Sequence, residues 1–138
     1  MAKHEYIDRV DECLPSGRLN PAARGWARQP LLRANLRKAW GRKKKWDYWC
    51  VNTPEVVVSF VYADVDYAGI AGLWICRPAD GLVVDVGRVV PFGRGIALPD
   101  EPCTGRMAVD GGGLSVSIDE RAGQTHLTAS APDTAVGP

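Results

Sequence analysis

The chain has 138 residues, the size of one ordinary domain, and its 46% apolar and 24% charged residues are the proportions of a globular protein. No apolar stretch approaches the roughly 20 residues that a helix needs to cross a bilayer, so the composition predicts a soluble protein. The net charge is only +1, but the first 46 residues carry +8 and the remainder carries −7, so the two parts should attract each other.

The N-terminal sequence MAKHEYIDRVDEC lacks the apolar core of a secretory signal, which predicts a cytoplasmic protein. His4 and His126 have no spaced partner, and the glycine-rich stretches FGRGIAL and DGGGLS match neither a dinucleotide fingerprint nor a phosphate loop. The sequence therefore predicts no metal and no cofactor. Without any CxxC pair, the cysteines are expected to be buried free thiols; they are Cys13, Cys50, Cys76 and Cys103.

Residues 1–45 lack a regular apolar period, because prolines and glycines interrupt every potential helix. Turns are predicted at Pro15-Ser16-Gly17 and near Asn20-Pro21. Irregularly spaced apolar residues are typical of an extended strap held on a core at several points; they are Leu14, Leu19, Trp26, Leu31, Leu32 and Leu36. We expect a basic coil strap that packs on a sheet.

The next region, 46–131, contains six runs rich in Val, Ile, Tyr, Trp and Thr, which predict β-strands at 46–52, 55–65, 67–77, 81–90, 113–120 and 124–131. The turn residues between them are mostly few enough for hairpins, so an antiparallel meander is the simplest topology. Val56 and Val58 alternate with Val57, so the second strand is expected to be covered on both faces. The sheet must close into a barrel or pack against another layer. Residues 132–138 are expected to form a flexible tail.

Three long stretches carry a resemblance to a known family: GRLNPAARGWARQPLLRANL, WGRKKKWDYWCVNTPEVVVSFVYADVDYAGIAGLW and VPFGRGIALP. They resemble the N-terminal portion of the bacterial family named domain of unknown function 2804 (DUF2804). The resemblance covers about residues 12 to 130 and is most specific in W-G-R-K-K-x-W-D-Y-W and Y-A-D-V-D-Y. Family members usually continue with a second segment at least as long, so we expect a truncated or divergent chain.

The resemblance also implies a fold. The family is similar to lipocalin-like (calycin) β-barrel proteins, at a distance from carotenoid hydratases and tocopherol cyclases, which place apolar isoprenoid-type substrates in barrels built from two halves. We therefore expect an all-β antiparallel meander, a half or partial barrel of lipocalin-like type, preceded by the extended strap. A fold-level analogy supports no particular reaction.

The stretch AWGRKKKWDYWCV places four cations between aromatic residues: Arg42, Lys43, Lys44 and Lys45. The plainest interpretation is a solvated loop whose aliphatic stems cover the tryptophans. The run is also consistent with an anionic ligand or substrate head group, a nucleic acid or a membrane surface. Four cations are a small footprint for nucleic acid.

Acidic residues supply the candidates for proton transfer. Asp47 shares a strand face with Trp49, and an acid beside indole rings at a barrel mouth can have a raised pKa and serve as a general acid. The alternative is an ion pair with a neighbouring Lys or Arg. Asp64 and Asp66 share a face with Tyr62, and paired carboxylates can share acid and base work or hold a hard cation. The alternative for this pair is a turn between strands.

Three functions remain open, and the sequence names no reaction. The first is a binding module for an apolar or amphipathic small molecule with an anionic end, whose site would include Arg42, Lys43, Lys44, Lys45, Trp46, Trp49, Tyr62 and Tyr67. The second is an enzyme of hydratase, cyclase or isomerase type on a lipid or isoprenoid-type substrate, with a proton donor among Asp47, Asp64, Asp66 and Tyr48. The third is an interaction or scaffold domain whose open sheet edge is covered by the missing second segment or by a second copy. An apolar cavity would favour the first function, and a carboxyl facing it with a raised pKa the second.

Overall fold

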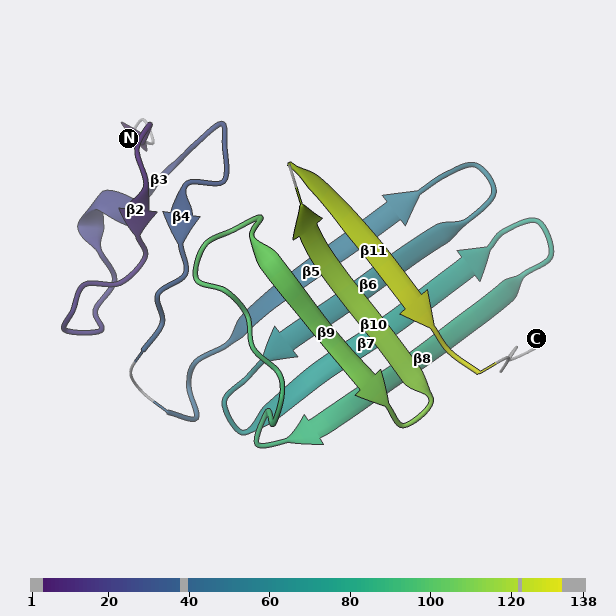
Figure 1. Cartoon of the computed structure of the whole chain (residues 1–138). Coiled ribbons are helices and arrows are strands. Elements are labelled where there is room, and N and C mark those ends of the chain that lie inside the picture. The colour runs from purple at the N-terminus through teal and green to yellow at the C-terminus, as the bar shows by residue number, and fades with distance from the viewer. Residues whose placement is uncertain (1–3, 38–39, 122, 133–138) are drawn as a thin grey trace.

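The computed structural model describes residues 4–37, 40–121 and 123–132, and its long strands form two antiparallel sheets (Figure 1). The four-stranded sheet has the order β5-β6-β7-β8, with bounds Lys45–Asn52, Val57–Asp64, Ala68–Arg77 and Leu82–Pro91. The three-stranded sheet has the order β9-β10-β11, with bounds Gly105–Gly111, Leu114–Arg121 and Gln124–Ser130. Each sheet is a meander of hairpins, and neither closes into a barrel within the described residues. The predicted all-β antiparallel fold is confirmed.

One long strand was missed by the sequence prediction. β9 begins and ends with glycine, and its Arg106 and Asp110 interrupt the apolar residues, so its β-propensity is weak. It pairs with β10, where Met107 lies opposite Ile118. Because β9 pairs with β10 and not with β8, the chain forms two sheets and not one continuous meander.

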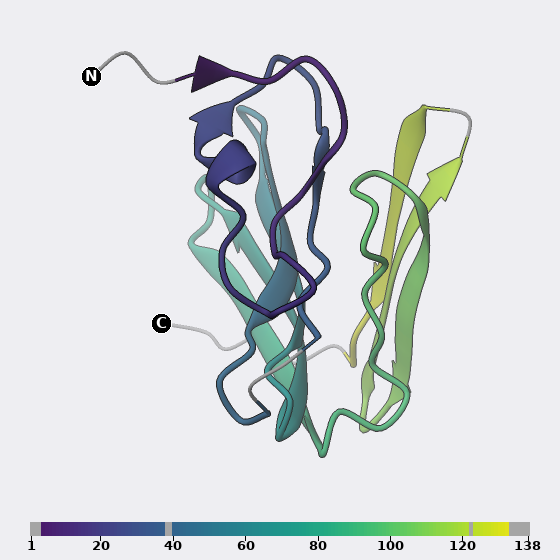
Figure 2. The ribbon, with the colours of Figure 1, turned by 90° about the vertical axis from the view of Figure 1, so that its left-hand side faces the viewer.

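The two sheets face each other and enclose the core (Figure 2). Their strands run in crossed directions in Figure 1, as in sandwiches with strongly angled layers. One sheet contributes the inward side chains of β6 and β7, and the other contributes those of β9 and β10. The buried apolar residues are Phe60, Tyr62, Ala71, Leu73, Ile96, Met107, Leu114, Val116 and Ile118.

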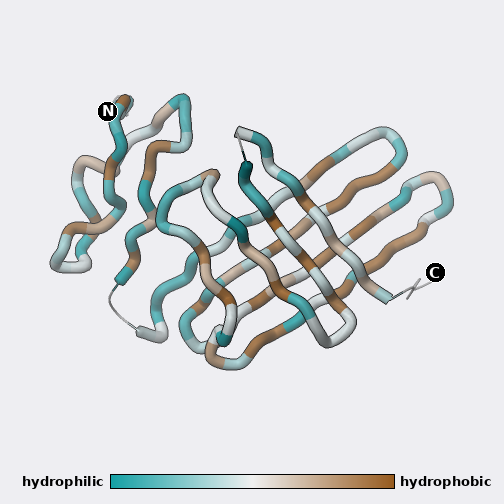
Figure 3. The backbone as a smooth tube through the Cα atoms, in the orientation of Figure 1, coloured by the Kyte–Doolittle hydropathy of each residue, from teal (hydrophilic) through white to brown (hydrophobic). Residues whose placement is uncertain are grey.

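Apolar residues recur along all four strands of this sheet (Figure 3), and the strand alternation places some of them on the outer face. Trp46, Tyr48 and Val89 are 65%, 56% and 65% exposed there. The strand alternation therefore predicted apolar residues on both faces correctly, but only the inner face is covered by another sheet in the described structure. The second cover that the pattern predicted is not among the described residues.

The described part of the strap, residues 4–37, lies beyond one end of the two sheets (Figures 1 and 2). Its elements are short: β1 (His4–Glu5), β2 (Val10–Asp11), the 3-10 helix η1 (Pro21–Ala23), β3 (Gly25–Trp26) and β4 (Leu32–Arg33). β1 pairs with β3 and β2 pairs with β4, both in parallel. The predicted turns are present, since Gly17 N donates to Leu14 O over 2.8 Å and Asn20 Oδ1 accepts from Ala22 N over 3.1 Å. The division into strap, meander and tail stays a prediction.

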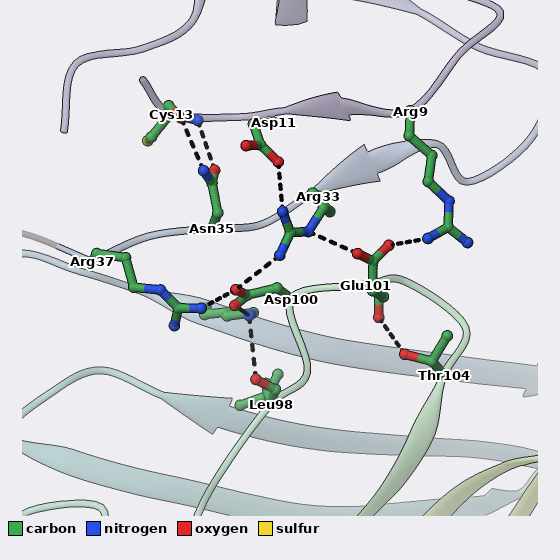
Figure 4. A network of polar contacts seen from close by, with 11 residues as sticks. Arg9, Asp11, Cys13, Arg33, Asn35, Arg37, Leu98, Asp100, Glu101 and Thr104 are labelled. Carbon is green, nitrogen blue, oxygen red and sulfur yellow. Dashed lines mark hydrogen bonds and ion pairs between the residues drawn. The ribbon is translucent and has the colours of Figure 1, made fainter. Parts of the chain in front are cut away.

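Ion pairs attach the strap to the loop that precedes β9 (Figure 4). Arg33 Nε lies 2.7 Å from Glu101 Oε1, and Arg37 pairs with Asp100. Asp100 also receives Lys45 from β5, at 2.9 Å between Nζ and Oδ1. The basic N-terminal part and the acidic remainder meet in this network. The network joins the strap, β5 and the loop before β9 at one end of the core.

Candidate functional site

A pocket of about 230 Å3 opens at the strap end of the core, and we call it the end pocket. Most of its lining surface is apolar. The pocket forms only in the folded chain, because its walls come from the strap, from the loop before β9 and from three strands. Its lining includes Ala34 from the strap, Lys45, Trp46, Asp47 and Trp49 from β5, Asp100, Glu101, Cys103 and Thr104 from the loop, Met107 from β9, and Glu120 from β10.

Strand geometry brings together two of the four carboxyls that line the end pocket, Asp47 and Glu120. The other two, Asp100 and Glu101, come from the loop before β9. Asp47 and Trp49 lie on the inner face of β5, because side chains alternate along a strand. Glu120 continues the inward row of β10 beyond the fully buried Val116 and Ile118. Each of these two acids thus stands at the end of an apolar inward row, where the core gives way to the pocket.

The electrostatics around Asp47 and Cys103 favour the protonated forms of these two groups. In the same pocket, the burial of Asp100 is outweighed by its ion pairs with Lys45, Arg37 and Arg33, which lower the pKa of that carboxyl. Burial raises the pKa of the Asp47 carboxyl, and the nearby Glu120 carboxylate raises it further. The expectation of buried thiols is wrong, since Cys50 and Cys103 are exposed and Cys13 and Cys76 are only partly buried. Partial burial still raises the pKa of the Cys103 thiol, and the charges of Glu120 and Asp47 add to that effect. A thiol with a raised pKa is a poor nucleophile near neutral pH. Asp47 is therefore suited to hold or deliver a proton, whereas Cys103 is not activated.

The hydrogen bonding of the end pocket is incomplete. Glu120 is oriented by β11, since the Thr125 hydroxyl donates to both of its carboxylate oxygens at 2.9–3.0 Å. Asp47 forms no ion pair with any described residue. The Trp49 indole N–H is buried and completes no hydrogen bond, although it lies close enough to Asp47 to lower the pKa of that carboxyl in part. A buried donor without an acceptor is uncommon in folded proteins.

Asp64 and Asp66 lie at a different corner, where β6 turns into β7. Lys43 Nζ lies 2.9 Å from Asp64 Oδ2 and 2.9 Å from Asp66 Oδ1. Asp66 Oδ2 also accepts from the backbone N–H groups of Gly41 and Lys43, at 2.8 and 3.2 Å, and Asp66 has a left-handed φ of 66°. The hydrogen bond from Lys43 lowers the pKa of Asp66. These contacts fasten the basic run to the turn, and they leave both carboxylates paired.

The predicted tyrosines are dispersed over the sheet. Tyr62 is 1% exposed, and its hydroxyl donates to Ala108 O and accepts from Ala97 N, both at 3.3 Å. Tyr62 therefore belongs to the core. Tyr48 lies on the outer face, on the other side of the sheet from Asp47, and Tyr67 is exposed in the turn after Asp66. None of these three lines the end pocket.

The four cations of the basic run have different surroundings. Lys43 and Lys45 are paired with carboxylates, whereas Arg42 and Lys44 form no hydrogen bond or ion pair with a described residue. Arg42, Lys43 and Lys44 line a separate pocket of about 290 Å3 together with Leu36. We call this the basic pocket. Of the predicted ligand-binding residues, only Lys45, Trp46 and Trp49 line the end pocket, and of these three the Trp46 side chain belongs to the outer face of the sheet.

Glu120 and Cys103 were not predicted as site residues. Glu120 has a sequence signal, because it follows Leu114, Val116 and Ile118 at the same two-residue spacing and so must share their inward face. No sequence pattern marks Cys103, since it lies in an irregular loop and adopts a left-handed φ of 53°. Only the folded chain places this loop beside β5.

Two further features are absent from residues 4–37, 40–121 and 123–132. No three His, Cys, Asp or Glu side chains there converge as a metal-binding group. No helix in those ranges is long and apolar enough to span a membrane. The cytoplasmic location stays a prediction.

Comparison with known proteins gives one match. The model of a protein family described as "Domain of unknown function (DUF2804)" matches residues 3–137. No curated protein and no solved structure matches the chain.

Proposed function

The chain belongs to the DUF2804 family, and from its geometry we propose that it binds an apolar or amphipathic small molecule in the end pocket. One observation carries the proposal: an apolar pocket contains a buried indole N–H without an acceptor next to a carboxyl without an ion-pair partner. Binding sites commonly combine an apolar lining with a few convergent polar groups. At about 230 Å3 the end pocket is below the roughly 300–1,000 Å3 of drug-sized sites, which favours a small ligand or one end of a longer ligand.

The polar groups of the end pocket favour a ligand hydroxyl. A hydroxyl both donates and accepts, so it can accept from the Trp49 N–H and donate to the Asp47 carboxylate. Glu120 already accepts from Thr125, so it has less capacity for the ligand. A ligand carboxylate would be repelled by Asp47 and Glu120, and Lys45 would not offset that repulsion because Asp100 already pairs with it.

The anionic end of the ligand, which the sequence predicted, is better matched to a pocket other than the end pocket. Arg42 and Lys44 are free of partners among the described residues, and the basic pocket adds Leu36 as an apolar contact. An amphipathic molecule with an anionic end is thus better matched to the basic pocket than to the end pocket. The anionic end stays a prediction.

A second candidate function is proton transfer to the bound molecule. The raised pKa of Asp47 favours it, because such a carboxyl keeps its proton to higher pH and can deliver it to an alkene or enol. Asp64 and Asp66 are less suited as proton donors, since both carboxylates pair with the Lys43 ammonium. The reaction class would be the hydratase, cyclase or isomerase chemistry that the family resemblance implies.

The binding proposal is tested with a soluble straight-chain alcohol such as 1-octanol. We expect the alcohol to shift the Trp49 indole N–H resonance in NMR, assigned by its loss in Trp49→Phe. Ala34→Phe should abolish the shift by filling the pocket, and Asp47→Asn should weaken binding about tenfold, the effect of one lost hydrogen bond to a charged group. Val89→Thr, on the outer face, is the control and should bind like the parent. Binding that survives Ala34→Phe, or no shift at Trp49 in the parent, would refute the proposal.

The proton-transfer candidate has its own measurement. Incubation with an isoprenoid alcohol in D2O should place deuterium on an alkene carbon, detected by mass spectrometry, and Asp47→Asn should stop the exchange. An alcohol that binds without exchange would leave the binding function and exclude proton transfer to that compound.

A further inference from the structure

A second hollow lies on the outer face of the four-stranded sheet, away from the end pocket. It measures about 210 Å3 and is lined by Tyr48 from β5, Trp74 from β7 and Asp85 from β8, among others. We call it the outer hollow. Its aromatic and acidic side chains are not used by the function proposed above.

The outer hollow opens over Gly87. Gly72 and Gly87 are direct cross-strand partners in the row that begins with Tyr48 and Val61, so two adjacent strands lack a side chain at the same level. A Cβ atom built on Gly87 would have only Ala71 O within 4 Å, at 3.9 Å, so the space above this residue is open. A Cβ atom on Gly72 would lie 2.9 Å from Val61 Cγ1, so the Val61 side chain already covers Gly72 and forms one wall of the hollow. Trp74 and Asp85, two residues away along β7 and β8, border this space.

The charge at the border of the outer hollow is negative and uncompensated. Asp85 lies directly opposite Trp74 across β7 and β8. Its carboxylate is exposed and forms no hydrogen bond or ion pair with a described residue. The nearest cation along β8 is Arg88. Its side chain lies on the opposite, inner face of the strand, where it donates to Asp110 O of the three-stranded sheet at 2.5 Å.

We propose that the outer hollow binds an organic cation of the substituted-ammonium class. The ammonium lies between the Asp85 carboxylate and the Trp74 indole, and its apolar substituents occupy the open space over Gly87, against the Val61 side chain that covers Gly72. The carboxylate supplies the opposite charge, and aromatic rings attract such cations through their negative faces. The open space over Gly87 supplies the room that a bulky ammonium group needs. An anion would be repelled by Asp85, and a neutral apolar molecule would leave the carboxylate unused.

Choline and its uncharged isostere 3,3-dimethylbutan-1-ol form the matched pair of probes, because they share shape and differ in charge. We expect choline to shift the Gly72 and Gly87 amide resonances and the Trp74 indole resonance in a titration followed by NMR. The isostere should bind about tenfold more weakly or not at all, since it lacks the charge that both partners recognise. Equal binding of the two probes would overturn the proposal, and so would choline shifts confined to other residues.

Variants locate the site independently of the end pocket. Asp85→Asn keeps the shape and removes the charge, and should weaken choline binding about tenfold. Gly87→Val should abolish binding by filling the hollow, and Gly87 does not have the left-handed φ that would strain a valine. Glu55→Gln, in an exposed turn, removes one negative charge elsewhere and should bind choline like the parent. Unchanged binding in both Asp85→Asn and Gly87→Val would refute the assignment, and circular dichroism confirms that each variant is folded.

Discussion

The inner and outer faces of the four-stranded sheet are similar in sequence and different in environment. Both faces alternate apolar and small residues along β6 and β7, but the inner one packs against the three-stranded sheet while the outer one exposes Trp46 and Tyr48. Glycines mark the same contrast. Gly69 is in contact with Ile96 on the inner side, whereas Gly87 has free space above it on the outer side. Apolar alternation therefore predicts which residues share a face, but contacts with other segments decide what that face does.

The largest effect should come from filling the space at the two glycines. A Cβ atom on Gly69 would lie 2.3 Å from Ile96 Cγ1 and 2.8 Å from Ile96 Cβ, inside the buried core. We expect Gly69→Ala to lower the free energy of unfolding by about 1–3 kcal/mol, the range for overpacked cores. Gly87→Ala should be neutral or raise it by about 0.5 kcal/mol, because alanine is favoured over glycine within a strand. Urea denaturation measures both, and equal losses would refute the contrast between the faces.

A smaller effect should separate two neighbouring lysines of the basic run. Lys43 turns toward the sheet corner and pairs with two carboxylates, whereas Lys44 points to solvent. We expect Lys43→Met to lower the free energy of unfolding by about 1–2 kcal/mol, because the carboxylates lose a charged hydrogen-bond donor. Lys44→Met is the control and should change it by less than about 0.5 kcal/mol. Equal free energies of unfolding for the two variants would mean that the ion pairs of Lys43 do not contribute measurably to stability.

The sequence predicted the strands better than the site, for physical reasons. Short-range alternation is enough to find β5 to β8, and it places Asp47 and Trp49 on one face. The second sheet was assigned too few strands, because the glycines and charges of β9 weaken its local signal. The end pocket also needs Cys103 and Glu120, which are distant along the chain from Asp47 and reach it only through packing of the two sheets. The alternative for Asp47 was an ion pair with a neighbouring Lys or Arg, and no described residue forms one. The alternative for Asp64 and Asp66 was a turn between strands, and both lie where β6 turns into β7. Residue spacing alone does not distinguish these alternatives.

The smallest effect should appear as a pH dependence of stability at the inner carboxyl. The pKa of Asp47 is higher in the folded chain than in the unfolded chain, so the folded state holds its proton to higher pH. Stability from this group is complete below the unfolded pKa and is lost as the pH rises through the folded pKa. Asp47→Asn removes that loss, so we expect the variant to match the parent near pH 4 and to exceed it by about 0.5 kcal/mol at pH 7, the size of effect for a partly solvated charge.

The outer carboxyl provides the matched control for this last comparison. Asp85→Asn alters an exposed side chain and should change the free energy of unfolding by less than about 0.5 kcal/mol at either pH. Thermal unfolding of the parent and both variants between pH 4 and pH 8 gives the three profiles. A difference between Asp47→Asn and the parent that is the same at every pH would mean that the side-chain replacement, and not the ionisation, is responsible. In that case the environment of Asp47 would no longer distinguish it from Asp85, and the argument for a proton donor in the end pocket would lose its electrostatic basis.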